Sequence, residues 1–543
     1  MKARTTLAAI ILASASGVAL AKPAPAAKAG KRDPKKLGAN ALVAWRQSGG
    51  GKPGRGAATA EEQTATQIQK LLRGPLREGQ TGLFVVDART GDALFSVNAE
   101  DPLNPASNVK MISTATAMEL LGPSFRYPTR LLGTAPDEAG VVRGDVYLLG
   151  SHDPTLTAAH LDDLGRSLAA RGITAIEGDV VVGTDATREA IFRGIVPVTI
   201  TAGDPGKPPI ATVTSAPSGG FDLVTLKVTA TTSRYVHRPL LTYRTETVKD
   251  PKGRTRIVLT IGGAIGRGDR AEYKLATTER TAAAAYGVIA SLRTYGVAFG
   301  GDVKTMELGD FVGDSVAAGG LPVELARHES ATIASIVADI NKWSINWLAD
   351  RLVMTAAALT RRRPPSMELA VDAMYGWLAR HPHVDRAGVV LDTGSGLSYR
   401  TRISAHELVD VVRAAGGFAG DTDPDTSSAW LRSLSVGGHD GTLRYRFQAG
   451  DVRGRIHGKT GTLSNVIALS GILDVDPARP LAFSLVTNSD APLSWDGTRK
   501  AHDLVVGELC RYLAKTAKAP LAPPAVELTA VPAAVKHDEP DAE

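Results

Sequence analysis

Ser107 and Lys110 stand three residues apart in the stretch PLNPASNVKMISTATAMELL (102–121), which predicts a helix beginning near the serine. This spacing places both side chains on one helix face. Backbone N–H groups at a helix start favour a developing oxyanion, and a neutral lysine can deprotonate a serine. A lysine becomes neutral when burial or a second cation lowers its pKa. The pair is either a nucleophile with its base, or a helix-start serine beside a surface lysine, with Asn104 or Ser107 as the cap.

A second hydroxyl and an amide follow in the stretch NKWSINWLAD. Ser344 and Asn346 are two residues apart, so they point the same way only from a loop or irregular turn between two helices. From such a turn, Ser344 could pass a proton from a base to a leaving group, and Asn346 could hold a substrate carbonyl. The alternative is that both are polar residues at helix ends.

The stretch RIHGKTGTL brings a lysine and a threonine to a predicted strand edge. Lys459 and Thr460 offer a cation and a hydroxyl, a pair that suits a carboxylate. Gly461 would let a substrate backbone lie close to the strand. The alternative is a polar turn between two strands.

The elements that must position these residues come from both ends of the chain. The N-terminal part predicts a helix over EEQTATQIQKLLR and a hairpin over TGLFVVDARTGDALFSVNA. The C-terminal part predicts strands over SNVIALSGILDV and PLAFSLVTNS and a closing helix over GTRKAHDLVVGELCRYLAK. Helices dominate the stretch after residue 321. Strands from both ends are therefore expected to join one antiparallel sheet with helices on its faces.

The middle of the chain has a different character, because short strands and turns replace the helices. Strands are predicted over GDVYLLG, GDVVVGTD, FDLVTLKVTATTS and TRIVLTIGG, with one helix over ERTAAAAYGVIASLRTYG. We therefore expect an inserted β-rich domain, or domains, at 131–315. The surrounding domain then has two parts, 61–130 and 316–515.

The two ends of the chain are not expected to belong to the folded domains, and the N-terminal end predicts export. Residues 1–21 have a basic start, an apolar run and the A-x-A pattern of Ala19 and Ala21, which is typical of a signal peptide; the alternative is a retained N-terminal anchor. Residues 22–60 and 516–543 are rich in Lys, Gly, Ala and Pro, and predict a disordered linker and tail. The single cysteine, Cys510, excludes an internal disulfide. The net charge of +6 suits an anionic surface such as a cell wall.

The three motifs S-x-x-K, S-x-N and K-T-G occur in the order found in β-lactamases and penicillin-binding proteins. With GDVYLLGSHDPTL, GITAIEGDVVV, LDTGSGLS and GGHDGTLRYRF, they make the chain resemble the class C low-molecular-mass penicillin-binding proteins, of penicillin-binding protein 4 type, from about residue 62 to 515. The resemblance implies an α/β (α+β) fold: a β-lactamase/transpeptidase-like domain with a helix-covered antiparallel sheet, interrupted by a β-rich insertion. The long gap between the first two motifs agrees with such an insertion.

The resemblance also implies an activity and its residues. The activity would be a serine-type D-Ala-D-Ala carboxypeptidase/DD-endopeptidase acting on peptidoglycan stem peptides. Ser107 would be the acylated nucleophile and Lys110 its base, kept neutral partly by the nearby Lys459. The other roles implied are proton relay by Ser344, binding of the substrate amide by Asn346 and of the terminal carboxylate by Lys459 and Thr460, and an oxyanion hole from the backbone N–H groups of Ser107 and Thr462.

The chain departs from the family pattern at Ile345, in the middle of S-x-N, where the family often has Asp, and at two further positions. After GDVVV the family tends to carry an acidic residue, but this chain has Gly183, with Asp185 two places later. After GSGLS the family tends to carry an arginine directly, but here Tyr399 precedes Arg400. Both of these further positions resemble those that contact the charged end of the stem peptide, so the resemblance does not predict the stem-peptide preference.

The expected partners are peptidoglycan peptides and, as covalent inhibitors, β-lactam antibiotics. We expect no cofactor, no metal, no nucleic acid and no stable membrane anchor, and a location in the periplasm or, if secreted, in the cell wall. Two alternatives stay open at this point: a non-catalytic wall-binding protein on the same fold, and a β-lactamase.

Overall fold

The computed structural model describes residues 59–517, with gaps at 184–194, 214–222, 252, 254, 278–279, 307–321, 382–387, 420–421 and 449–451. The predicted signal peptide and nearly all of the predicted linker and tail lie outside these residues. In the described part of the chain, no helix combines the length and the hydropathy needed to span a membrane.

Contacts divide the described chain into two compact units. The core unit comprises residues 59–123, 333–353 and 367–517. The intervening unit comprises residues 124–332 and 354–366. Each unit has its own hydrophobic core.

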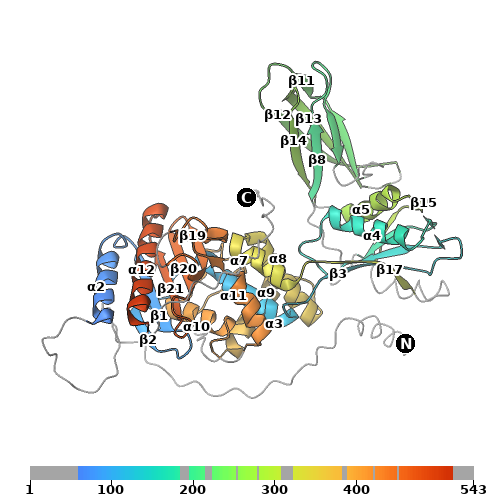
Figure 1. The fold of residues 1–543 in the computed structure, drawn as a ribbon. Helices are drawn as coiled ribbons and strands as arrows, with labels where there is room; N and C mark the ends of the chain where they lie inside the picture. Colours follow the sequence, from blue (N-terminus) through green and yellow to red (C-terminus); the bar gives the residue numbers. More distant parts are fainter. Residues whose placement is uncertain are drawn as a thin grey trace, which may run out of the picture. The chain divides into compact units, whose positions relative to one another are not determined.

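An antiparallel sheet of six described strands forms the centre of the core unit (Figure 1). The strand order is β18 (Ser435–Val436), β19 (Ile456–Leu463), β20 (Val466–Leu473), β21 (Leu481–Asn488), β1 (Gln80–Asp87) and β2 (Ala93–Val97). β1 pairs with β21 along its whole length, from Gln80↔Asn488 to Asp87↔Leu481. The prediction that strands from both ends of the chain join one sheet is thus confirmed.

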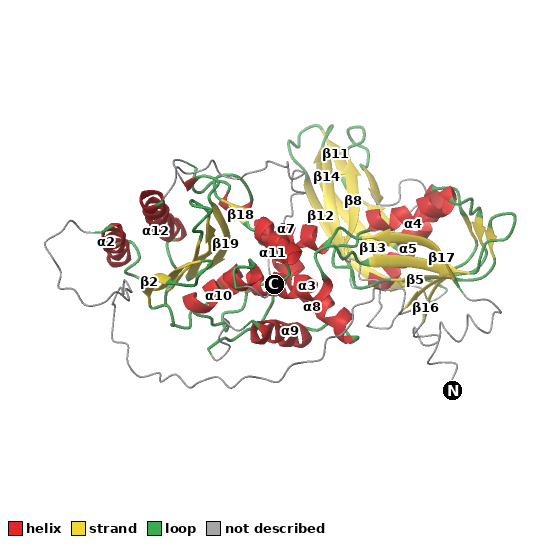
Figure 2. Ribbon diagram, turned by 60° about the horizontal axis from the view of Figure 1, so that its bottom comes forward, coloured by secondary structure: helices red, strands yellow, loops and turns green. Residues whose placement is uncertain are grey.

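Helices cover both faces of this sheet (Figure 2). On one face, α2 (Ala60–Arg73) and α12 (Trp495–Thr516) pack together, and side chains such as Ile68, Leu485 and Leu509 form a core between them and the strands. On the other face, α10 (Ala405–Ala415) contacts β1, β20 and β21. This arrangement is the predicted mixed architecture of helices and antiparallel sheet.

A cluster of helices completes the core unit. It contains η1 (Ala106–Asn108), α3 (Val109–Leu121), α7 (Ile333–Trp343), α9 (Met367–Arg380), α11 (Pro424–Ser433), η2 (Gly441–Leu443) and the part of α8 (Asn346–Arg361) up to residue 353; the rest of α8 belongs to the intervening unit. α3 contacts α7, α9, α10 and α11, and its residues from Val109 to Met118 are all buried. Because this helix is enclosed on every side, the side chain of Lys110 in its first turn is held away from water.

The intervening unit is rich in strands. Its described helices are α4 (Ala158–Ala170) and α5 (Arg280–Thr294), which pack against each other. One five-stranded sheet has the order β16 (Val303–Met306), β7 (Val180–Gly183), β5 (Val146–Leu149), β3 (Pro128–Gly133) and β17 (Val323–Glu329). The remaining strands are β4 (Val141–Val142), β6 (Ala175–Ile176), β8 (Ile195–Thr201), β9 (Ile210–Val213), β10 (Val224–Val228), β11 (Thr231–Ser233), β12 (Leu240–Lys249), β13 (Thr255–Gly266), β14 (Arg270–Ala276) and β15 (Ala298–Phe299).

Candidate active site

Ser107 lies in η1, one short turn before α3. The preceding residue, Ala106, has a φ of 48°, in the left-handed region that alanine rarely adopts. Asn104 Oδ1 accepts a hydrogen bond from the Ala106 N–H at 2.8 Å. Of the two predicted caps, Asn104 is therefore the one that binds a backbone N–H, while the Ser107 hydroxyl faces Lys110. Strained backbone of this kind is common beside reacting groups.

The Lys110 side chain is fully buried beside the serine. Its Nζ lies 3.0 Å from Ser107 Oγ, 2.6 Å from Asn346 Oδ1 and 2.7 Å from the carbonyl oxygen of Ser395. The amide and carbonyl oxygens can only accept hydrogen bonds, so each takes an N–H of the lysine. The hydroxyl can also donate. A neutral Lys110 in this position would therefore direct its lone pair at the Ser107 proton.

Ser344 occupies the break between α7 and α8, with a φ of 59°. This break confirms the predicted irregular turn between two helices. It directs Asn346 towards Lys110, and it places Ser344 Oγ 2.8 Å from Lys459 Nζ. The first two motifs are thus linked through Asn346, and the second and third through Ser344.

The third motif lies on β19, at an edge of the sheet as predicted. β18 pairs with β19 only at Gly458 and the residue before it, so from Lys459 onward β19 has no strand neighbour on that side in the described chain. Thr460, Gly461 and Thr462 line a cavity next to this edge. Because side chains alternate along a strand, the two threonines share one face.

Gly461 has a structural reason to be glycine that the sequence did not reveal. A Cβ at this position would lie 2.6 Å from the carbonyl oxygen of Pro105 and 3.2 Å from the Cβ of Ala106. The missing side chain therefore lets β19 lie against the protein's own segment before Ser107. The sequence predicted that a substrate backbone would lie close to Gly461. Gly461 does line the cavity, but the backbone that lies close to it in the structure is that of Pro105.

Lys459 is fully buried, and its amine faces Ser344 Oγ and its neighbour's carbonyl oxygen, that of Thr460 (2.9 Å). Burial lowers the pKa of Lys459 well below its usual value, and the positive charge of Lys110 lowers it further. Thr460 and Thr462 line the cavity, whereas Lys459 does not. The lysine therefore lies behind the cavity wall, where it could influence the cavity only through its charge.

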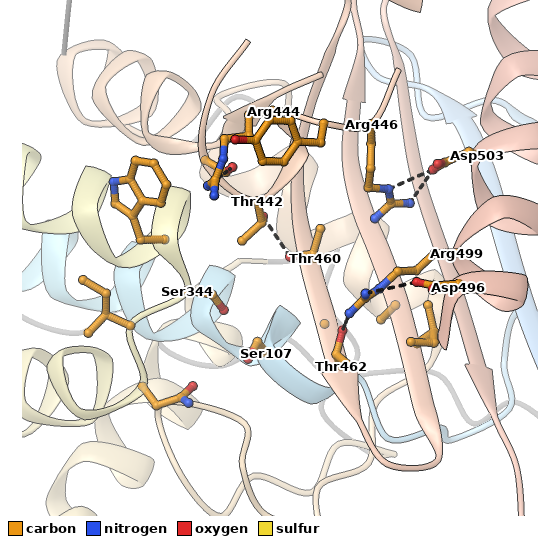
Figure 3. A pocket seen from close by; sticks show the side chains of 18 of the residues that line it. Ser107, Ser344, Thr442, Arg444, Arg446, Thr460, Thr462, Asp496, Arg499 and Asp503 are labelled. Atoms are coloured by element: carbon orange, nitrogen blue, oxygen red, sulfur yellow. Dashed lines mark hydrogen bonds and ion pairs between the residues drawn. The ribbon is translucent and has the colours of Figure 1, made fainter. Parts of the chain in front are cut away.

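These residues open onto a cavity of about 1350 Å³ (Figure 3). Ser107 and Ser344 lie on one side of the cavity, with Thr460 and Thr462 opposite. The three motifs, each more than a hundred residues from the next in sequence, therefore meet at one place in the core unit. Among the described residues, no group of three His, Cys, Asp or Glu side chains is arranged to hold a metal ion.

Three residues next to this site were not identified by the motif analysis. Asp350 Oδ1 accepts the N–H of Ser395 at 2.7 Å, and burial raises the pKa of its carboxyl group. Thr442 Oγ1 accepts a hydrogen bond from Thr460 at 2.9 Å, and Arg499 donates one to Thr462. Only Asp350 had a sequence signal: it lies four residues after Asn346, one helical turn further along α8.

Gly183, Tyr399 and Arg400 are not among the residues that line this cavity. Gly183 ends β7 in the intervening unit, and Asp185 lies outside the described residues. Arg400 is largely exposed and forms an ion pair with Asp392 in the core unit.

A profile of the D-Ala-D-Ala carboxypeptidase 3 (S13) family matches residues 64–507. The chain belongs to this family. Over 475 residues it is 29% identical to the D-alanyl-D-alanine carboxypeptidase of Actinomadura sp. (strain R39), covering 79% of this chain and 82% of the relative. Over 454 residues it is 27% identical to the carboxypeptidase DacB of Mycolicibacterium smegmatis, covering 80% of this chain and 82% of the relative.

The fold is also similar to a solved structure. The crystal structure of penicillin-binding protein 4 (dacB) from Haemophilus influenzae, complexed with a β-lactam, superposes with a TM-score of 0.59 at 19% identity, covering 82% of this chain and 99% of that one. The predicted family, fold class and enzyme class are confirmed. This S13 chain is a serine-type D-Ala-D-Ala carboxypeptidase with the penicillin-binding-protein fold. The two alternatives, a wall-binding protein and a β-lactamase, are not favoured.

Proposed function

We propose that this S13 carboxypeptidase releases the C-terminal D-alanine of peptidoglycan stem peptides through an acyl-enzyme on Ser107. The observation that carries this assignment is the 3.0 Å contact between Lys110 Nζ and Ser107 Oγ, made by a fully buried lysine. Asn346 and the Ser395 carbonyl hold the amine in place, so its direction towards the serine is fixed before substrate arrives.

In the acylation step, Ser107 Oγ attacks the carbonyl carbon of the penultimate D-alanine, and its proton moves to Lys110 Nζ. The carbonyl oxygen becomes an oxyanion between the backbone N–H groups of Ser107 and Thr462, both of which line the cavity. The amide C–N bond then breaks. Its nitrogen receives the proton from Lys110 by way of the Ser344 hydroxyl, and D-alanine leaves as a neutral amine.

In the deacylation step, a water molecule attacks the ester carbon and gives a proton to Lys110. The ester C–O bond breaks, Ser107 recovers that proton, and the shortened peptide leaves as a carboxylic acid, which becomes a carboxylate by releasing its remaining proton to solvent. The same sequence would cut a cross-link, in which the leaving amine belongs to a second stem peptide. We therefore include DD-endopeptidase activity in the proposal.

The carboxylate of the leaving D-alanine would bind at the edge of β19. Thr460 and Thr462 supply hydroxyl groups on one face of the strand, next to the cavity. When Lys459 holds the proton of the lysine pair, it supplies positive charge from behind the wall, and Ser344 connects it to the reacting groups. Asn346, which also lines the cavity, would bind the substrate amide.

β-Lactam antibiotics would acylate the same serine, as the complex of the Haemophilus relative suggests. Their ring carbonyl takes the position of the scissile amide, and their carboxylate takes that of the leaving group. We also propose that the protein is exported, because its substrate lies outside the cytoplasmic membrane and residues 1–21 have the pattern of a signal peptide.

The test is covalent labelling of the purified protein with fluorescent penicillin, followed by assay of D-alanine release from a stem pentapeptide. The wild-type protein should retain the label and release D-alanine. Ser107→Ala should do neither, whereas Ser233→Ala, which removes a hydroxyl in the intervening unit, should match the wild type. A label that persists on Ser107→Ala would end the assignment. Rapid turnover of penicillin without retained label would favour a β-lactamase.

A further inference from the structure

Arg499, on the first turns of α12, reaches across to the edge of β19 (Figure 3). Its Nη2 donates a hydrogen bond to Thr462 Oγ1 at 3.2 Å. A guanidinium group has donors but no acceptor, so it fixes the role of the hydroxyl. With its oxygen accepting from Arg499, Thr462 keeps its own O–H for another acceptor. In the described part of the chain no protein acceptor takes it.

Arg499 has no close, shielded ion-pair partner among the described residues, although burial raises the pKa of Asp503 and the charge of Arg499 acts to lower it. The nearest ion-pair partner of Arg499 among the described residues is Asp496, at 4.0 Å and with a side chain 96% exposed. Such a pair is weak in water. The neighbouring Arg446, on the same cavity wall, differs: its Nε donates to Asp503 Oδ1 at 2.9 Å. Arg499 is therefore the less neutralised of the two arginines, and it lies against the Thr462 hydroxyl.

A purely structural role for Arg499 has less support. The start of α12 is already tied to the end of β19 by Trp495, whose Nε1 donates to the carbonyl oxygen of Leu463 at 3.1 Å. The Arg499 guanidinium lies over the Trp495 ring, 5.8 Å from its centroid, but the side chain is 37% exposed and lines the cavity, so packing does not enclose it.

We infer that Arg499 is a positioning residue that sets substrate specificity. It turns the Thr462 hydroxyl into a hydrogen-bond donor directed into the cavity and places a positive charge behind it. The site then favours substrates whose leaving group carries a free carboxylate next to the scissile amide. This inference rests on the proposed function, because it concerns the leaving-group side of the same site.

The experiment compares two peptides, one ending in D-Ala-D-Ala with a free carboxylate and one with that carboxylate converted to a primary amide. Arg499→Gln should reduce kcat/KM for the acid roughly 10- to 100-fold, mainly by raising KM, since a hydrogen-bond network to a charged group is lost. Turnover of the amide should stay unchanged. Arg499→Lys, which keeps the charge, should recover part of the preference for the acid.

The matched control is Arg511→Gln, which removes an arginine that pairs with Glu508 further along the same helix. It should leave both peptides and the melting temperature unchanged. Equal losses on the acid and the amide in Arg499→Gln would overturn the inference and indicate a structural role. If the wild type releases nothing from either peptide and takes no penicillin label, the proposed function fails, and the inference fails with it.

Discussion

The amine nitrogen of Lys459 lies 2.8 Å from the hydroxyl oxygen of Ser344. Lys459 is fully buried and does not line the cavity. It can therefore influence the reacting groups only through its hydrogen bond with Ser344 and through its charge. Two buried lysines, Lys110 and Lys459, thus share one low-dielectric region, where the positive charge of each disfavours protonation of the other. Their titration belongs to the pair.

The first prediction concerns the pH dependence of acylation. Burial and the charge of Lys110 lower the pKa of Lys459, so kcat/KM should rise with pH as the pair loses a proton. Lys459→Met removes one charge and leaves the remaining amine easier to protonate. The acid limb of the pH profile of kcat/KM should therefore move to higher pH.

The control for this measurement is Lys70→Met, which removes an exposed lysine from α2. Its acid limb should coincide with that of the wild type. An acid limb that stays in place in Lys459→Met would show that the second lysine does not influence the base.

The second prediction uses the backbone of Ser344. Both Ser344→Ala and Ser344→Gly remove the hydroxyl that we propose as the proton relay, so both should reduce acylation roughly 100-fold or more. Because φ is 59° at this position, glycine fits without strain and alanine does not. Ser344→Gly should therefore be more stable than Ser344→Ala by about 1 kcal/mol in urea unfolding. If Ser344→Gly, the more stable variant, also acylates markedly faster than Ser344→Ala, then backbone strain and not the lost hydroxyl causes the loss of acylation.

The third prediction concerns the contact between β19 and the segment before the nucleophile. In Gly461→Ala, the new Cβ would lie 2.6 Å from the Pro105 carbonyl oxygen, so one of the two segments must move. We expect a loss of stability of about 1–3 kcal/mol and at least a tenfold loss of penicillin acylation. Gly300→Ala is the control, because a Cβ there meets no atom within 4 Å. Normal acylation by Gly461→Ala would contradict the importance of this contact.

Much of the fold and of the site follows from local sequence patterns. The apolar spacing with Ile68 predicts α2, and the alternating strands at both ends predict the sheet that joins β1 to β21. The motifs place Ser107 at a helix start and Ser344 in a turn, as the structure has them. These features depend on residues close in sequence, which is why they can be predicted.

Other features depend on packing between distant segments. The direction of the Lys459 amine depends on the position of α7 relative to the sheet, and the need for glycine at 461 depends on η1. The contact of Arg499 with Thr462 joins α12 to β19 across 37 residues, with no motif to mark it. A single sequence carries no direct signal for such tertiary contacts, so the supporting residues around the motifs could not be predicted.

The fourth prediction concerns His502, which is fully buried on α12 with Nε2 2.9 Å from Thr487 Oγ1. Burial, with a smaller effect of Arg446, lowers its pKa from 6.5 to about 3. Between these values the unfolded chain binds a proton that the folded chain does not, so stability falls as pH falls. From pH 6.5 to 4.5 this group should cost about 2–3 kcal/mol of unfolding free energy. His502→Gln should lose this part of the dependence in urea unfolding at the two pH values; an unchanged slope would contradict the assignment.

The fifth prediction has the opposite sign. Burial raises the pKa of Asp410, on α10, to about 6, although His406 and Arg413 act to lower it. Between pH 3.8 and 6 the folded chain binds the proton more readily, so this group adds stability as pH falls, by about 2 kcal/mol from pH 6 to 4.5. Asp410→Asn mimics the protonated form. It should be more stable than the wild type at pH 7 and lose more stability than the wild type on acidification to pH 4.5. If urea unfolding shows the same change for both proteins between these pH values, the Asp410 carboxyl does not titrate in this range.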